Sequence, residues 1–332
     1  MISVEVDEES DSDWNKNLLG SKYGTVYQTR EYGQYVQSRI KSKPIYVKFI
    51  TSSGELAGQL LMFQSFKGRG KLAKHLGKGL LYSVASKASA LLPKYTYWNF
   101  GPVLFDKGFQ TEISECLGDL LIYWKGKFTG KTHPLNPDFD FSQKFGFQRK
   151  DEGTFVIDLQ QDLEQILDKT DKKSVKKNIE RSQNRGVTIT QITSKEDLKT
   201  YFEILSQHRQ ESKISIYSLD DISTGYSILK SVGQIGFLAW QNDIPVGGIS
   251  ASTFNGYINE SGIARTKKDV EEKLYSQDLL RWKIIEWGKK NNCSYYDLSG
   301  VKISNRTDKE DGIFRNKEKW GGKFITYPTF LN

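Results

Sequence analysis

The fold is decided by the stretch Tyr295-Tyr296-Asp297-Leu298-Ser299-Gly300, which reads as a short strand of aromatic and apolar residues bounded by glycine. A basic, glycine-rich stretch follows, Gly312-Ile313-Phe314-Arg315-Asn316-Lys317-Glu318-Lys319-Trp320-Gly321-Gly322. We expect it to be a connection that leads into a closing strand, Lys323–Tyr327. Taken alone, the pattern also fits a terminal hairpin with solvated lysines, so the preceding residues must decide.

Composition predicts a globular chain of two domains. Its 332 residues are 37% hydrophobic and 13% aromatic, which is enough to build a sizeable core. No run of about 18 apolar residues occurs, so we expect no transmembrane helix. The acidic N-terminus, residues 1–13, lacks the basic flank and apolar centre of a secretory signal. Cys116 and Cys293 are far apart, which indicates neither a disulfide framework nor a zinc site and favours a reduced, cytoplasmic compartment.

The net charge of +8 is concentrated in residues 67–94, 169–185 and 302–323. Clustered positive charge favours partners that carry phosphate, namely nucleic acid, nucleotide-linked sugars or an anionic membrane. Ordinary solubility explains a net charge of this size equally well.

Two basic helices are expected from the periodicity. One lies within residues 68–93 and can either pack on a sheet or lie on an anionic membrane through residues 71–92. The other runs from Lys172 to Arg185 and ends at Gly186. It places Lys173, Lys177 and Arg181 on one face, where they can contact nucleic-acid phosphates or simply be solvated.

A weak internal repeat indicates the domain organisation. The expected hairpins at residues 46–66 and 236–254 both consist of an apolar strand, a short polar turn and a returning strand with a small residue and glycine. A strand-helix-strand unit follows later in each half. We therefore expect an α/β protein with two similar domains, residues 1–155 and 156–332.

The second half resembles the GNAT acyltransferase fold in the order of its expected hairpin, strand, helix and strand. The whole chain more closely resembles the FemABX family, aminoacyl-tRNA-dependent peptidyltransferases that build peptidoglycan cross-bridges and have two GNAT-like domains in tandem, each with a mixed sheet. Five segments carry this resemblance in the family's order: Gly101-Pro102, Lys176-Lys177-Asn178-Ile179 with Gly186-Val187, Leu279-Leu280-Arg281-Trp282, Tyr296-Asp297-Leu298-Ser299-Gly300, and Gly312 to Gly322.

The chain departs from the family at several positions. The family's Phe-Lys pair is Asn316-Lys317 here, and its Thr-x-x-Arg element appears as His208-Arg209-Gln210-Glu211. The coiled-coil arm of some members is absent. The loop by which ordinary GNAT enzymes hold the CoA pyrophosphate is missing between Ala264 and Gln277. Backbone amides at a helix start can hold phosphate without that loop, so its absence only weakens a CoA-dependent interpretation.

The resemblance implies a peptide-bond-forming acyltransferase that moves an aminoacyl group from aminoacyl-tRNA to an amine of a nucleotide- or lipid-linked cell-envelope precursor, such as one of peptidoglycan. An acyl-CoA-dependent GNAT-type N-acyltransferase and a noncatalytic tRNA- or membrane-binding module stay open as alternatives. We expect no cofactor and no metal, a monomer, and a cytoplasmic location that includes the inner face of the membrane.

Candidate site residues follow from the same resemblance. Lys317 is expected beside the acyl end of the donor, where a cation stabilises the oxyanion, and Asp297 ends a strand where α/β folds often place working residues. A surface lysine and a turn-capping aspartate are the corresponding structural interpretations. The expected substrate-binding residues are Arg209, Arg315, Lys319, Tyr257 and Tyr296. The three histidines form no triad or metal pattern.

Overall fold

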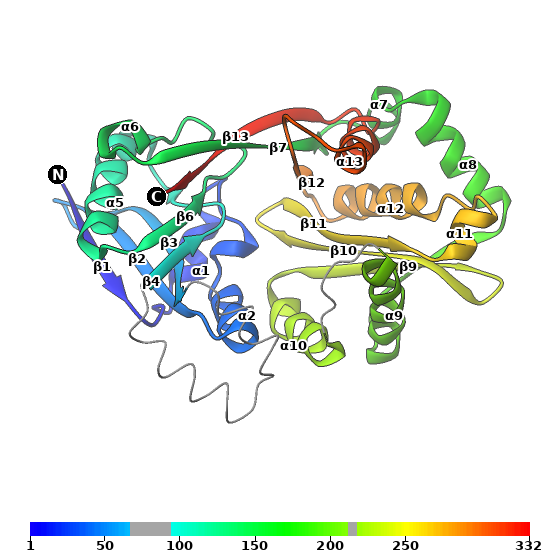
Figure 1. Ribbon diagram of the computed structural model, residues 1–332, viewed down its shortest axis with the longest axis horizontal. Coiled ribbons are helices and arrows are strands. Elements are labelled where there is room, and N and C mark those ends of the chain that lie inside the picture. Colours follow the sequence, from blue (N-terminus) through cyan, green and yellow to red (C-terminus); the bar gives the residue numbers. More distant parts are fainter. Residues whose placement is uncertain (67–93, 212–217) are drawn as a thin grey trace. The chain divides into compact units, whose positions relative to one another are not determined.

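The computed structural model describes residues 1–66, 94–211 and 218–332 (Figure 1). The basic helix expected at residues 68–93, with its proposed membrane contact through residues 71–92, lies outside the described residues. The chain divides into two compact units. Unit 1 consists of Met1–Glu152 and Thr326–Asn332, and unit 2 consists of Gly153–Ile325.

The last residues of the chain depart from the expected domain ranges of 1–155 and 156–332. The end of strand β13 (Lys323–Leu331) pairs antiparallel with β6 (Lys127–Lys131), with Thr329 opposite Lys131. These pairs place residues 326–332 in unit 1. Strands β7 (Gln148–Asp158) and β13 therefore both cross the boundary between the units.

Unit 1 is built on an antiparallel meander that is followed by a parallel strand. Strands β1 to β4 pair in chain order, β6 pairs parallel with β4, and the end of β13 pairs with β6. The additional elements are β1 (Ile2–Asp7), β2 (Lys43–Thr51), β3 (Leu56–Phe66), β4 (Lys94–Trp98), β5 (Val103–Leu104), α1 (Trp14–Leu19), α2 (Arg30–Ile40), α5 (Gln110–Trp124), α6 (Ser142–Phe145), and the 3-10 turns η1 (Val26–Gln28) and η3 (Lys107–Phe109).

Unit 2 repeats this arrangement. Strands β8 to β11 form an antiparallel meander, β12 pairs parallel with β11, and β7 pairs antiparallel with β12. Its elements are β8 (Val187–Gln191), β9 (Gln234–Gln241), β10 (Ile244–Phe254), β11 (Tyr257–Arg265), β12 (Tyr295–Val301), α7 (Leu163–Lys169), α8 (Lys177–Asn184), α9 (Lys195–Glu211), α10 (Leu219–Leu229), α11 (Lys267–Glu271), α12 (Ser276–Lys290), α13 (Asp308–Glu318), the π-helical turn η4 (Lys172–Lys176) and the 3-10 turn η5 (Lys230–Val232).

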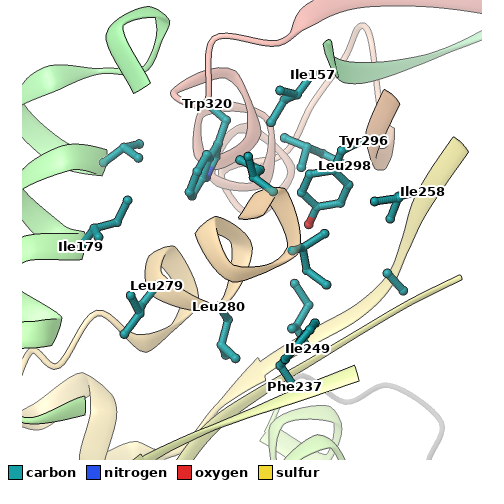
Figure 2. Close-up of a cluster of buried hydrophobic side chains, with 14 of the residues drawn as sticks. Ile157, Ile179, Phe237, Ile249, Ile258, Leu279, Leu280, Tyr296, Leu298 and Trp320 are labelled. Carbon is teal, nitrogen blue, oxygen red and sulfur yellow. The ribbon is translucent and has the colours of Figure 1, made fainter. Parts of the chain in front are cut away.

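The core of unit 2 forms because α12 is amphipathic. Leu280, Ile284 and Ile285 are fully buried, as their helical spacing predicts, and they pack with Ile249 and Tyr296 of the sheet (Figure 2). Helices α9 and α10 lie on the opposite face of the sheet from α12 (Figure 1). In this three-layer arrangement, α12 packs against β8, β9, β10 and β11.

The prediction of an irregular connection between β12 and the closing strand is wrong in one respect, because this segment contains helix α13. A capping box begins this helix: the Thr307 side chain accepts from the backbone of Glu310, and the Glu310 side chain accepts from the backbone of Thr307. The helix ends before Gly321, whose φ of +69° suits glycine. A Cβ at Gly321 would also lie 2.2 Å from the Lys169 carbonyl oxygen. The expected α/β class with mixed sheets is confirmed.

Candidate functional site

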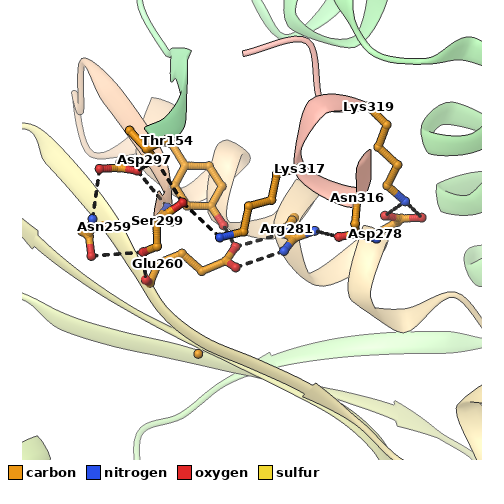
Figure 3. A network of polar contacts seen from close by, with 12 residues as sticks. Thr154, Asn259, Glu260, Asp278, Arg281, Asp297, Ser299, Asn316, Lys317 and Lys319 are labelled. Atoms are coloured by element: carbon orange, nitrogen blue, oxygen red, sulfur yellow. Dashed lines mark hydrogen bonds and ion pairs between the residues drawn. The ribbon is translucent and has the colours of Figure 1, made fainter. Parts of the chain in front are cut away.

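The candidate site lies where the parallel strands β11 and β12 stop pairing. They pair at three positions, which are Tyr257 with Tyr295, Ile258 with Tyr296, and Asn259 with Asp297. Beyond Asn259, strand β11 continues alongside β10, whereas β12 shifts register against β7 between Asp297 and Gly300. In open α/β sheets, ligands bind outside the carboxyl ends of parallel strands. A buried polar network occupies this position (Figure 3).

Asp297 lies at the last paired position and is 0% exposed. Tyr257 donates its hydroxyl to Oδ2 at 2.6 Å, and Asn259 donates Nδ2 to the same oxygen at 3.1 Å. The backbone N–H of Ser299 donates to Oδ1 at 2.7 Å, and the hydroxyl of Thr154 donates to that oxygen as well. Burial raises the pKa of Asp297, although these donors oppose the rise. A carboxylate has about four acceptor sites, so these contacts saturate it.

A buried ion pair lies beside Asp297. The Arg281 guanidinium binds the Glu260 carboxylate through two bonds, Nε to Oε2 at 2.9 Å and Nη2 to Oε1 at 3.0 Å. The Tyr296 hydroxyl donates to Oε2 of Glu260 at 2.7 Å. Burial alone would raise the pKa of Glu260, but the charge and hydrogen bonds of Arg281 outweigh it and hold the pKa below its usual range. Both side chains are therefore charged.

Lys317 reaches the end of β12 from helix α13. Its side chain is largely buried, and its Nζ donates to the carbonyl oxygens of Ser299 at 3.0 Å and Gly300 at 3.2 Å (Figure 3). An ammonium group has three donors, and these two bonds use two of them. Burial lowers the pKa of Lys317, whereas the negative charges of Glu260 and Asp297 oppose this change.

Neighbouring residues attach α13 to the helices packed around it. The side-chain oxygen of Asn316 accepts from Nη1 of Arg281 at 2.5 Å. Lys319 pairs with the buried Asp278 of α12 at 2.6 Å, and Nδ2 of Asn178 on α8 donates to the same carboxylate at 2.8 Å. Helix α13 is thus held to α12 by polar side chains on either side of Lys317.

The structure brings together four of the predicted site residues. Lys317, Asp297, Tyr257 and Tyr296 all belong to the network, although both tyrosine hydroxyls bind buried carboxylates. Lys319 is nearby and paired with Asp278. Arg315 is exposed on α13, and Arg209 is partly buried on α9 near Tyr201. The catalytic and substrate-binding roles of these residues stay predictions.

The sequence interpretation missed Glu260, Arg281, Asn259, Thr154 and Ser299. Arg281 had a visible signal, since it interrupts the apolar face Leu279-Leu280 of an amphipathic helix. A buried arginine needs a partner. Its partner Glu260 is 21 residues away on a strand, so no local pattern could have identified the pair.

The predicted nucleic-acid-binding residues lie on one continuous helical segment, η4 followed by α8. Lys173, Lys177 and Arg181 are all exposed. The Asp171 side chain caps the segment by accepting from the backbone N–H groups of Lys173 and Ser174. The segment ends before Gly186, as expected, and Gly186 itself has a φ of +73°.

An acidic side chain of α11 contacts the start of α12. The backbone N–H of Ser276 donates to Oδ1 of the buried Asp269 at 2.8 Å. This carboxylate already satisfies a helix amide that a phosphate would otherwise use. Elsewhere in the described ranges, 1–66, 94–211 and 218–332, no three His, Cys, Asp or Glu side chains gather as metal ligands, and no helix is long and apolar enough to cross a membrane.

No protein-family model and no curated protein matches the sequence. Among solved structures, FemX is similar with a TM-score of 0.74 and 11% identity, over 98% of this chain and 96% of that chain. L-PGS from Bacillus licheniformis is similar with a TM-score of 0.57 and 12% identity, over 98% and 93%. A tandem GNAT protein from the clavulanic acid biosynthesis pathway is similar with a TM-score of 0.52 and 12% identity, over 100% of this chain and 97% of that chain. The predicted resemblance to the FemABX family is therefore confirmed at the level of the fold, which is that of two tandem GNAT-like domains.

Proposed function

We propose that this protein is an N-acyltransferase that transfers an aminoacyl group from aminoacyl-tRNA to an amine of a cell-envelope precursor. The observation that carries the proposal is the buried ammonium of Lys317, held by two carbonyl oxygens where β11 and β12 stop pairing. Such a cation is available to stabilise negative charge in a site that excludes water.

The reaction forms an amide bond between the acceptor nitrogen and the acyl carbon of the donor. The ester bond to the terminal ribose oxygen of the tRNA breaks, and the proton lost by the nitrogen ends on that oxygen. The tetrahedral intermediate carries an oxyanion, which would accept a hydrogen bond from the third N–H of the Lys317 ammonium. A single well-placed donor of this kind contributes about 3 kcal/mol to lowering the barrier.

Asp297 has a different role in this proposal. Its oxygens are saturated by four donors, so it has no acceptor site left for a substrate proton. It holds the end of β12 in place, and with it the Ser299 carbonyl that binds Lys317. Tyr257 supports Asp297, and Tyr296 supports Glu260. Substrate contacts of Arg209, Arg315 and Lys319 stay part of the proposal.

The choice of donor and acceptor is supported by two kinds of observation. The exposed cations Lys173, Lys177 and Arg181 follow one helical segment and can track the phosphates of a tRNA. A further similar structure, with a TM-score of 0.58 and 9% identity, is the C-terminal domain of a protein provisionally described as a lysylphosphatidylglycerol synthetase from Agrobacterium fabrum. That name describes an aminoacylated lipid, which favours an aminoacyl donor and an envelope acceptor. We also propose a monomer that works in the cytoplasm or at the inner face of the membrane.

An acyl-CoA donor is the second candidate, since a tandem GNAT protein shares the fold. The carboxylate of Asp269 at the start of α12 disfavours a pyrophosphate there. The test offers the protein labelled aminoacyl-tRNA or labelled acetyl-CoA together with amine-bearing nucleotide-linked and lipid-linked precursors. Transfer from aminoacyl-tRNA is the expected result. Transfer from acetyl-CoA alone would show that the donor is an acyl-CoA and not aminoacyl-tRNA. Binding of tRNA without transfer from either donor would indicate a noncatalytic binding module.

A further inference from the structure

Asn316, the residue that precedes Lys317, forms a hydrogen bond with a buried side chain. Asn316 replaces the aromatic residue expected from the family resemblance, and its side-chain oxygen accepts from Nη1 of Arg281 at 2.5 Å. Arg281 and its partner Glu260 are almost completely buried. An aromatic side chain could not accept this bond and would leave a buried guanidinium N–H without that partner.

The chain of contacts continues to the catalytic candidate. Glu260, Arg281 and Asn316 are linked in series from β11 through α12 to α13, and the next residue along α13 is Lys317 (Figure 3). Neighbouring residues on a helix share its position and rotation, so fixing Asn316 also fixes where the Lys317 side chain begins. The far end of that side chain is fixed by the carbonyl oxygens of Ser299 and Gly300.

We propose that Asn316 is a positioning residue which, through the Glu260–Arg281 pair, holds Lys317 in the buried location where its ammonium can act. The inference rests on the proposed function for its kinetic consequence, but its structural content concerns Lys317 alone. Glu260 has a second effect, because its negative charge opposes the loss of the Lys317 proton.

The charged groups around Lys317 predict opposite responses to two substitutions. Burial lowers the pKa of Lys317, Glu260 and Asp297 raise it, and Arg281 lowers it. Asn316→Leu keeps the branched side-chain shape but removes the acceptor, so α13 should loosen, Lys317 should become more solvated, and its pKa should rise toward that of an ordinary lysine. Glu260→Gln removes the opposing negative charge, so the pKa should fall further. A general loss of stability would not move the two variants in opposite directions.

The experiment titrates Lys317 by NMR in protein labelled with ¹³C-lysine, with the Lys317→Arg variant identifying the signal by its absence. Asn316→Gln keeps a neutral amide acceptor for Arg281 and should leave the titration closer to that of the unsubstituted protein than Asn316→Leu does. Asn15→Leu is the matched control, since it removes the hydrogen bonds that another half-buried asparagine makes in unit 1, to the Glu31 carboxylate and to the backbone N–H of Arg30. It should destabilise the fold and leave the Lys317 titration unchanged.

Activity supplies a separate readout. Misplacement of a reacting group by about 1 Å costs about 10²-fold in rate, so Asn316→Leu should lower kcat by up to that factor with KM little changed. Asn316→Gln, which keeps a neutral acceptor, should lower kcat less than Asn316→Leu. An unchanged Lys317 titration in Asn316→Leu, or shifts of the same sign in Asn316→Leu and Glu260→Gln, would overturn the inference. Because the titration needs no substrate, it gives this answer even if no acyl donor is found.

Discussion

Each unit contains one pair of parallel strands at the same place in its topology, β4 with β6 in unit 1 and β11 with β12 in unit 2. The side chains at the ends of the two pairs differ. In unit 1, β4 and β6 pair at four positions, and the Gly101 N–H then donates to the Lys131 carbonyl at 3.0 Å, which keeps the ends joined. The Trp98 ring packs over Gly130 and donates its Nε1 to the Gly101 carbonyl at 3.0 Å. In unit 2, β11 and β12 diverge after three positions, and charged side chains occupy the space.

This difference teaches what the fold requires. Unit 1 shows that the meander, helix and parallel strand can be built with an aromatic closure, so buried charges are not needed for the topology. Buried ion pairs contribute little net stability, because desolvation offsets their attraction. Their presence in unit 2 therefore marks that strand end as the candidate site.

The largest expected effect comes from breaking the buried pair. Arg281→Met leaves Glu260 charged and unpaired, so the free energy of unfolding should fall by about 3–5 kcal/mol. In unit 1, Lys131 pairs with Glu152 at 2.7 Å, but both side chains are about 30% exposed. Lys131→Met should cost only about 0–1 kcal/mol. Urea denaturation of both variants measures the contrast, and equal losses would remove the distinction between the two strand ends.

Catalysis should depend on unit 2 in the same way. Lys317→Ala removes the cation from the end of β12 and should lower kcat and kcat/KM together by about 10²–10³-fold. Lys131→Ala removes a lysine from the end of β6 and should leave both parameters close to those of the unsubstituted protein. Steady-state kinetics of folded variants provide the comparison. A raised KM with unchanged kcat in Lys317→Ala would show that Lys317 grips the donor and does not stabilise the transition state.

The aromatic closure of unit 1 is tested by glycine substitutions. A Cβ at Gly130 would lie 1.8 Å from Cζ2 of Trp98, so Gly130→Ala should destabilise the protein by about 1–3 kcal/mol. A Cβ at Gly312 on α13 would meet no other part of the protein within 4 Å, and Gly312→Ala should stabilise the helix by about 0.5–1 kcal/mol. Thermal denaturation distinguishes the two. Destabilisation by Gly312→Ala would contradict the helical assignment of residues 308–318.

The smallest effect concerns donor binding. Replacing Lys173 and Lys177 with alanine should weaken tRNA binding and reduce the slope of log affinity against log salt by about one for each lost phosphate contact. The control removes two exposed lysines of unit 1, Lys125 and Lys127, and therefore the same charge. Filter binding at several salt concentrations gives the slopes. Identical slopes for the two double variants would assign tRNA binding to overall charge.

Local patterns predicted much of the fold. The hairpins β2–β3 and β9–β10 followed from periodicity alone. Helix α13 was predicted as a connection because glycines and lysines dominated the interpretation, although Thr307 and Glu310 have the spacing of a capping box. The return of residues 326–332 to unit 1 could not be predicted, because Thr329 and Lys131 pair across about two hundred residues with no local signal.

The candidate site was predicted only in part. Lys317 and Asp297 were named from a resemblance, and the structure places both at the end of β12. The saturation of Asp297 could not be read from the sequence, because its donors Thr154 and Tyr257 come from two other strands. Glu260 and Arg281 were not predicted for the same reason, since strand pairing and helix packing bring them together.

The central claim is that a lysine ammonium at the end of β12 stabilises the transition state, and the pH dependence of kcat tests it most directly. Lys317 has a pKa below that of an ordinary lysine, about 10.4, because it is buried. Its charged form is lost as the pH rises through that lowered value, so kcat should fall on the alkaline side before ordinary lysines titrate. Lys317→Arg stays charged, so its lower kcat should show no such fall. The same alkaline fall in both proteins would contradict the account.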